Sequence, residues 1–317
     1  MKKIVILLAV IVACSQSRPI SPISEIEANG TVTDMVLNKD ELIIGTDRGI
    51  LQVYNHKESR FIKTIKLPKI IDFVGDKISA KIYSVDKIDF KYLILSNSGK
   101  NGYTNLSIYW NNQTKQLISH KDKIIILKAR FIDSTHILLG LLGNEAILYD
   151  IESETKIYQL SLGQSKFSDF ALNEDKSQAI FACESGVLTL IDTQKGNIIR
   201  EFRGQNVDNV YSVDIKKDRV VGAGQDRRGS IYSVSNDSGS YIEGTFLVYA
   251  TALSPSANIV AFAMDEENSI YIYKPQTKEQ IAILSGQKSR LSSIIFQDEQ
   301  TLFSSSDDDT IMVWNIK

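Results

Sequence analysis

The sequence predicts an all-β fold, a seven-bladed β-propeller formed by residues 22–317. Seven copies of one short alternating strand recur along the chain, and five of the six gaps between them lie near 41 residues. Each copy belongs to a unit of short strands separated by polar turns, with hardly any helical periodicity. A period of about 40 to 45 residues with four short strands is typical of a propeller blade.

Each copy of the recurring strand ends in an aromatic or apolar anchor. The gaps between successive anchors are 55, 40, 42, 43, 39 and 41 residues. The anchors are Tyr54, Tyr109, Tyr149, Ile191, Val234, Tyr273 and Trp314. We expect them to occupy the third strand of each blade.

The last unit lacks its fourth strand. Earlier units continue past the anchor with segments such as "TKIYQLSLG" and "KEQIAILSG", but only three residues follow Trp314. The segment "PISEIEANG" (Pro22 to Gly30) has the same length, alternation and terminal glycine. We therefore expect an N-terminal strand to complete the last blade, which would remove an exposed sheet edge. The alternative is an open ring in which this segment is only a tether.

Several units resemble the WD-repeat family. "LSPSAN" (Leu253 to Asn258) resembles that family's turn between its first two strands, and "SSSDDDTIMVWN" resembles its strand, turn and strand. The resemblance implies a structural role for Asp308. Where the family has Gly-His, this chain has Gly-Gln at residues 163–164, 204–205 and 286–287. We therefore expect the family's His–Ser–Asp–Trp hydrogen-bond network to be incomplete in every blade.

The first residues resemble an export signal. Lys2 and Lys3 precede the apolar run "IVILLAVIVA", which is shorter than the roughly 20 residues of a membrane-spanning helix. The exit "IVAC" resembles a bacterial lipobox, which implies a lipoprotein signal peptide at residues 1–13, acylation of Cys14 and a short tether at 14–21. The expected location is the periplasm, with the lipid as the only membrane contact. The alternatives are a soluble periplasmic protein cleaved after Ser15, or a cytosolic protein.

Cysteine content and charge exclude several classes of protein. Cys14 and Cys183 are the only cysteines, and the apolar setting "AIFACESG" predicts a buried, inert thiol at Cys183. The formal charge is −2, or −4 without residues 1–13, and there is no basic block. Nucleic acid is therefore not an expected partner.

The gap of 55 residues contains the largest departure from the repeat. About 14 extra residues fall mainly in "KLPKIIDFVGDKISAK" (Lys66 to Lys81), and a smaller excursion spans Ser96 to Asn105. Both connections emerge on one rim of such a propeller, so we expect the two excursions to be neighbours. Insertions gathered on one face often mark a binding face. The candidate contact residues are Ile71, Phe73, Asp76, Lys77 and Tyr103. The alternative is a tolerated surface insertion.

Other candidate sites are weaker. The three histidines, His56, His120 and His136, share no metal-ligand spacing, so no metal, cofactor or catalytic residue is expected. The acidic turns at 265–268 and 307–309 could hold Ca²⁺ weakly or be ordinary solvated turns. Arg227 and Arg228 could meet an acidic partner or form a solvated turn.

Three function classes follow. The first is a non-enzymatic, monomeric scaffold for another exported protein. Within it, the lipobox, the seven units and "IDFVGDKISAKIYSVD" (Ile71 to Asp86) resemble the NapL-type accessory propellers associated with periplasmic nitrate reductase. The second is an outer-membrane assembly lipoprotein, because "LTLIDTQKGNIIREF" (Leu188 to Phe202) resembles the quinoprotein-like propeller repeat. The third is a lactonase- or quinoprotein-like enzyme, which the scarcity of histidine disfavours.

Overall fold

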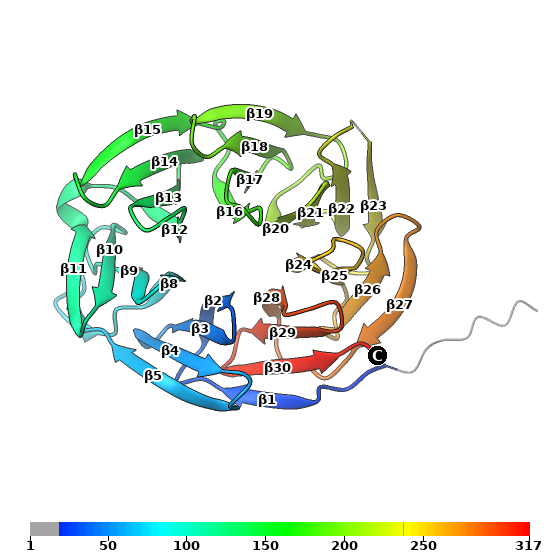
Figure 1. Ribbon diagram of the computed structural model, residues 1–317, viewed down its shortest axis with the longest axis horizontal. Helices are drawn as coiled ribbons and strands as arrows, with labels where there is room; N and C mark the ends of the chain where they lie inside the picture. The colour runs from blue at the N-terminus through cyan, green and yellow to red at the C-terminus, as the bar shows by residue number, and fades with distance from the viewer. Residues whose placement is uncertain (1–18, 237) are drawn as a thin grey trace, which may run out of the picture.

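Seven four-stranded antiparallel sheets surround a central axis like the blades of a propeller (Figure 1). The computed structural model describes residues 19–236 and 238–317. In every blade the strand nearest the axis is β2, β8, β12, β16, β20, β24 or β28 (Figure 1). No helix in this described part of the chain is long and apolar enough to span a bilayer. The predicted seven-bladed β-propeller is confirmed.

In each of the first four blades, the strands follow one another along the chain from the innermost to the outermost. Blade 1 comprises β2 (Val32–Asn38), β3 (Glu41–Thr46), β4 (Ile50–Asn55) and β5 (Arg60–Lys66). Blade 2 comprises β8 (Ile82–Ile88), β9 (Lys91–Asn97), β10 (Thr104–Trp110) and β11 (Gln113–Ile118). Blade 3 comprises β12 (Ile126–Phe131), β13 (His136–Leu141), β14 (Glu145–Asp150) and β15 (Thr155–Ser161). Blade 4 comprises β16 (Phe167–Leu172), β17 (Gln178–Cys183), β18 (Leu188–Asp192) and β19 (Asn197–Phe202).

The other three blades repeat this order, except that the last one takes its outer strand from the start of the chain. Blade 5 comprises β20 (Val210–Lys216), β21 (Arg219–Gly224), β22 (Arg228–Ser233) and β23 (Gly239–Glu243). Blade 6 comprises β24 (Ala250–Leu253), β25 (Val260–Ala263), β26 (Ile270–Lys274) and β27 (Glu279–Leu284). Blade 7 comprises β28 (Leu291–Phe296), β29 (Thr301–Ser306), β30 (Thr310–Asn315) and β1 (Ser24–Glu27). A small hairpin of β6 (Ile70–Ile71) and β7 (Lys77–Ile78) lies between blades 1 and 2, and a 3-10 turn covers His120–Asp122.

The ring is closed by β1, which pairs antiparallel with β30 from Ser24↔Val313 to Glu27↔Thr310. The side chain of Ile26 is buried between blades 7 and 1. Beyond the strand, the Ala28 N–H donates to the Asp309 carbonyl oxygen at 2.7 Å. The prediction that an N-terminal strand completes the last blade is confirmed.

One predicted anchor is wrong by two residues. Val234 lies just beyond β22, and Tyr232 occupies the position that Tyr54 and Trp314 hold in their blades. Val220↔Tyr232 corresponds in register to Leu42↔Tyr54. With Tyr232 as the anchor, the gaps to Ile191 and Tyr273 are both 41 residues. The spacing of the anchors is therefore more regular than the gaps of 43 and 39 residues that Val234 gave.

The core lies between the blades, where the flat faces of neighbouring sheets pack together. One cluster joins Leu95 and Leu106 of blade 2 to Phe131 and Leu139 of blade 3, all of them fully buried. Burying one such side chain contributes about 1.5–3 kcal/mol. The second strand of each blade is buried on both faces, and in blades 1 to 6 its buried residues are mainly apolar. For the same reason Gly140 has no side chain: a Cβ there would lie 2.6 Å from the ring of Phe167 in blade 4.

Side-chain carboxylates connect the innermost strands of neighbouring blades. In four blades an aspartate of the inner strand accepts a hydrogen bond from a backbone N–H of the next inner strand. These bonds are Asp34–Val85 at 2.8 Å, Asp86–Phe131 at 2.7 Å, Asp169–Val213 at 3.0 Å and Asp214–Leu253 at 2.8 Å. Because each acceptor is an aspartate carboxylate, these bonds are stronger than bonds between two neutral groups. They hold the blades in register around the axis.

Blade 7 contains a complete relay of buried polar side chains. The Trp314 indole N–H donates to Ser304 Oγ at 2.8 Å, and this hydroxyl donates to Gln287 Oε1 at 2.8 Å. Gln287 Nε2 in turn donates to Ser306 Oγ at 2.7 Å. The relay contains neither the histidine nor the aspartate of the WD-repeat network, so that network is not formed in blade 7. The amide of Gln287 both accepts and donates in its place.

Candidate docking surface

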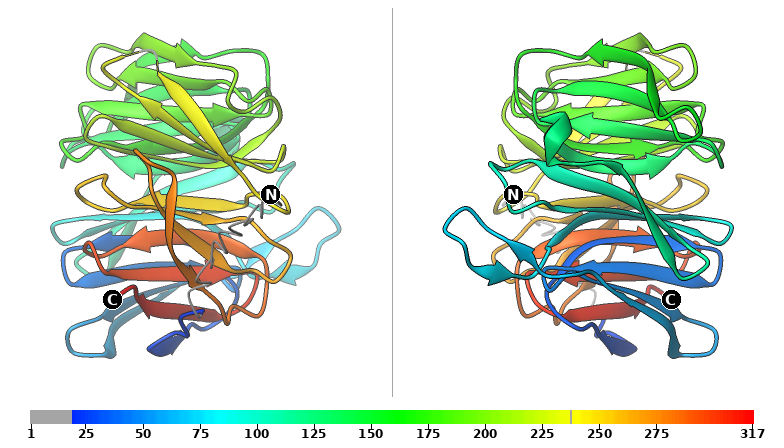
Figure 2. Two further views of the ribbon diagram at one scale, coloured as in Figure 1. Left: turned by 90° about the vertical axis from the view of Figure 1, so that its right-hand side faces the viewer. Right: turned by 90° about the vertical axis from the view of Figure 1, so that its left-hand side faces the viewer.

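The 14-residue insertion forms a hairpin that projects from one face of the ring (Figure 2). Its two short strands pair at Ile70↔Ile78 and Ile71↔Lys77. The turn between them is closed by Asp72, whose Oδ1 accepts the N–H groups of Val74 at 3.0 Å and Asp76 at 2.8 Å. A backbone bond from Asp72 N to Asp76 O at 3.0 Å completes it. The turn is thus ordered by its own hydrogen bonds.

The hairpin exposes three large apolar side chains. Phe73 is 85% exposed and Val74 is 65% exposed at the tip, and Ile71 is 46% exposed on the first strand. Ile70 and Ile78 are half-buried. Only the base of the insertion therefore folds back onto the protein, and the tip leaves its apolar residues in water.

The second excursion lies beside the hairpin, as predicted. Gly99 has a φ of +74°, and a Cβ there would lie 2.4 Å from the Ile71 carbonyl oxygen. The loop is closed by the Tyr103 carbonyl oxygen, which accepts from Ser98 Oγ at 2.7 Å. Only glycine permits both the left-handed backbone and this close approach. The hairpin at 66–81 and the loop at 96–105 together form one surface, here called the hairpin face.

The predicted contact residues occupy different parts of this surface. Ile71 and Lys77 face one another across the hairpin and are exposed, as are Phe73 and Asp76 at the turn. Tyr103 is half-buried at the end of the neighbouring loop. The structure therefore brings these five residues into one region between blades 1 and 2.

Arg227 and Arg228 lie elsewhere. Arg227 lies in the turn between β21 and β22 of blade 5, and Arg228 begins β22, several blades away from the hairpin. The Arg228 guanidinium stacks over the Tyr241 ring at 4.4 Å and donates to the Gln205 carbonyl oxygen at 3.3 Å. Arg227 is exposed. These two residues do not form one site with the hairpin face.

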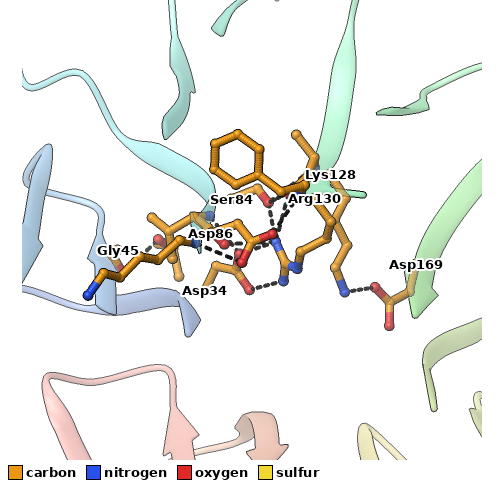
Figure 3. Close-up of polar contacts among 12 residues, drawn as sticks. Asp34, Gly45, Ser84, Asp86, Lys128, Arg130 and Asp169 are labelled. Atoms are coloured by element: carbon orange, nitrogen blue, oxygen red, sulfur yellow. Dashed lines mark hydrogen bonds and ion pairs between the residues drawn. The ribbon is translucent and has the colours of Figure 1, made fainter. Parts of the chain in front are cut away.

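The central channel is the second feature that could carry function. It is a cavity of about 600 Å³ lined by inner-strand residues of all seven blades. Arg130 of β12 reaches past blade 2 to Asp34 of β2, with Nη1–Oδ2 at 2.9 Å and Nη2–Oδ1 at 3.0 Å (Figure 3). Its Nη1 also donates to Ser84 Oγ at 2.5 Å. One arginine therefore links the inner strands of three blades.

The remaining charges of the channel are also engaged with one another. Lys128 Nζ lies 2.5 Å from Asp169 Oδ1 across the boundary of blades 3 and 4 (Figure 3). Burial raises the pKa of Asp86, against the opposing effect of the Arg130 and Lys176 cations. Burial also opposes the charge of Arg130, but the carboxylates of Asp34, Asp86 and Asp169 together leave the pKa of the guanidinium raised. This pattern is that of a structural ion network.

The structure gives no grouped ligands for a metal ion. Among residues 19–236 and 238–317, no three or more His, Cys, Asp or Glu side chains are arranged to hold one. In the acidic turns, Asp265 accepts from the Ser269 N–H at 2.7 Å, and Asp307 pairs with Arg290 at 2.8 Å. Cys183 is buried, whereas Cys14 lies outside the described residues.

Sequence reasoning missed the channel network. Its signal was the aspartate that recurs in "TVTD", "YSVD", "FSD" and "YSVD" within the first strand of four units. Arg130 lies two blades beyond Asp34, and the two residues could not be connected without the ring geometry. No protein-family model and no curated protein matches the chain, so the fold assignment rests on the arrangement of its strands.

Proposed function

We propose that the protein is a non-enzymatic, exported propeller that acts as an interaction scaffold for another exported protein. It resides in the periplasm and is held at a membrane by a lipid on Cys14. The hairpin face is its docking surface, and the flank formed by Ile71 and Tyr103 contacts the partner.

The observation that carries this proposal is the construction of the hairpin face. Two separate departures from a regular repeat meet there, through the contact of Gly99 with Ile71. A surface loop tolerated by chance has no need of an ordered turn or of exposed apolar residues, whereas a docking surface uses apolar anchors inside a polar rim. Preformed order also lowers the entropic cost of binding.

Further features favour the accessory role over the two alternatives. The resemblance of residues 71–86 to the NapL-type propellers suggests a component of the nitrate reductase system as the partner. The assembly lipoproteins of the quinoprotein-like group favour eight blades, whereas this ring has seven. The channel carboxylates of Asp34 and Asp169 are occupied by Arg130 and Lys128, which favours a structural channel over a lactonase- or quinoprotein-like centre.

Site-specific photo-crosslinking tests the docking role. A photoreactive amino acid at position 71 or 103 should link the exported protein to one and the same partner. The matched control is position 90, because Phe90 is 83% exposed in the turn at the opposite end of β8. Equal adducts from all three positions, or none from 71 and 103, would reject the hairpin face as a protein-docking surface. Identification of the adduct by mass spectrometry tests the nitrate reductase assignment separately.

A further inference from the structure

The tip of the hairpin differs from its flank in shape and chemistry. Phe73 and Val74 are adjacent, both largely exposed, and lie at the end of a projection from the ring (Figure 2). The backbone of the turn that carries them is held by two hydrogen bonds to Asp72, from the N–H groups of Val74 and Asp76. Contiguous exposed apolar residues in an ordered segment indicate a contact surface.

Exposed lysines lie on the hairpin and on the segments that adjoin it, and are here called the lysine collar. Lys66, Lys69, Lys77 and Lys100 are exposed, and none forms an ion pair within the described part of the chain. Lys81 lies over the Tyr83 ring at the base of the hairpin, 5.9 Å from its centroid. Within residues 66–81 and 96–105, both of which the structure describes, the acidic residues are Asp72 and Asp76, and Asp72 is engaged in the turn. The tip therefore has a net positive surrounding.

This combination fits a lipid surface better than a protein. A convex tip needs a complementary pocket on a protein, and lysine is depleted from the centres of protein interfaces. The interfacial region of a bilayer accepts an apolar tip without a preformed pocket, and anionic headgroups attract a basic collar. We propose that Phe73 and Val74 insert into the interfacial region of an anionic membrane while the lysine collar binds its headgroups.

The inference goes beyond the proposed function and does not depend on a protein partner. It replaces the expectation that a lipid on Cys14 is the only membrane contact, and it assigns Phe73 to lipid instead of protein. A second contact with the bilayer would add to the attachment that the lipid provides. It would also turn the hairpin face toward the membrane.

Vesicle flotation of the purified Cys14→Ala protein tests this contact without the lipid anchor. Flotation is compared on vesicles of phosphatidylcholine alone and on equimolar phosphatidylcholine and phosphatidylglycerol. We expect stronger binding to the anionic vesicles than to phosphatidylcholine alone. Adding Phe73→Ser with Val74→Ser, or Lys69→Glu with Lys77→Glu, should weaken it by about tenfold or more. Adding Phe90→Ser should leave it unchanged.

Because the apolar leader is common to all of these variants, differences between them report the tip alone. Thermal unfolding of each variant shows whether the fold is intact. Equal flotation of the tip variant and the Phe90→Ser control, or no flotation of the parent on anionic vesicles, would overturn the proposal. Absence of vesicle binding together with protein adducts from a photoreactive group at position 73 would assign the tip to a protein partner. Crosslinks from 71 and 103 are scored independently, so the two proposals can fail separately.

Discussion

At the scale of single residues, buried charges near the axis are held by partners on other blades. Asp86 is fully buried, yet its two oxygens accept the N–H groups of Lys87 and Phe131. Arg130 makes five hydrogen bonds around Asp34 and Ser84. Removing one partner of a buried ion pair costs about 3–5 kcal/mol, because the other charge is left without compensation.

Asp86→Asn should give a pH-dependent loss of stability. Burial raises the pKa of Asp86 above its ordinary value of 3.8, so the folded state binds this proton more tightly than the unfolded chain. The contribution of the proton to stability is fully present below that ordinary value and is lost as the pH rises through the raised pKa. The cost of the substitution should therefore be larger near pH 4 than near pH 7, as measured by urea unfolding. A larger cost near pH 7 would mean that attraction to Arg130 outweighs burial.

At the scale of strands, the fold depends on an element far from its partners in sequence. β1 supplies the outer strand of blade 7 and covers the edge that β30 would otherwise expose. Other outer strands limit their own free edges with bulges, as at Ile62 in β5 and Ile157 in β15, where one residue has no partner. The outer edge of blade 7 is therefore covered by an N-terminal strand, and the outer strands of blades 1 and 3 contain β-bulges.

Ile26→Ala should destabilise the protein by about 2–5 kcal/mol, because it opens a cavity between blades 7 and 1. Ile26 is 3% exposed in the cluster with Val32, Met35 and Ile311. Ile23→Ala is the matched control in the same segment, since Ile23 is 63% exposed and its loss should change stability by less than about 0.5 kcal/mol. Denaturant unfolding measures both. Similar values for the two variants would mean that β1 does not support the ring.

At the scale of the whole molecule, the ring is a rigid support that presents one face. Hydrophobic clusters between blades and carboxylate bonds along the axis hold the sheets together. The features that break the repeat, the hairpin and the adjoining loop, gather between blades 1 and 2. The loop of blade 5 that contains Arg227 lies in a different part of the ring.

Cys14→Ala should abolish fatty-acid labelling and shift the protein from the membrane fraction toward the soluble fraction. The lipid is the strongest hydrophobic anchor expected for the mature chain. Any bound remainder should be released by high salt, because the lysine collar acts by electrostatic attraction. Metabolic labelling and fractionation measure both effects. A wild-type protein that takes up no label would favour the soluble periplasmic alternative.

The sequence alone determined the blade count, the closing strand and the location of the insertion, because all three depend on a period and on alternation within a strand. Alternation along a strand determines which side chains point toward the neighbouring blade. Tyr54 and Trp314 could therefore be identified as equivalent anchors from the sequence, and they hold the same register position in their blades. Even the error at Val234 was a shift of two residues, which preserves the face of the strand.

Only the tertiary structure decided which distant side chains meet. Arg130 and Asp34 are 96 residues apart, and their contact depends on the curvature that brings blades 1 and 3 to one axis. Gln287 became part of a relay because blade 7 places its amide beside Ser304 and Ser306. Phe73 could have folded onto the blade or projected from it, since sequence periodicity carries no information about an isolated hairpin tip. The local bonds of Asp72 and the packing of Gly99 against Ile71 direct it outward.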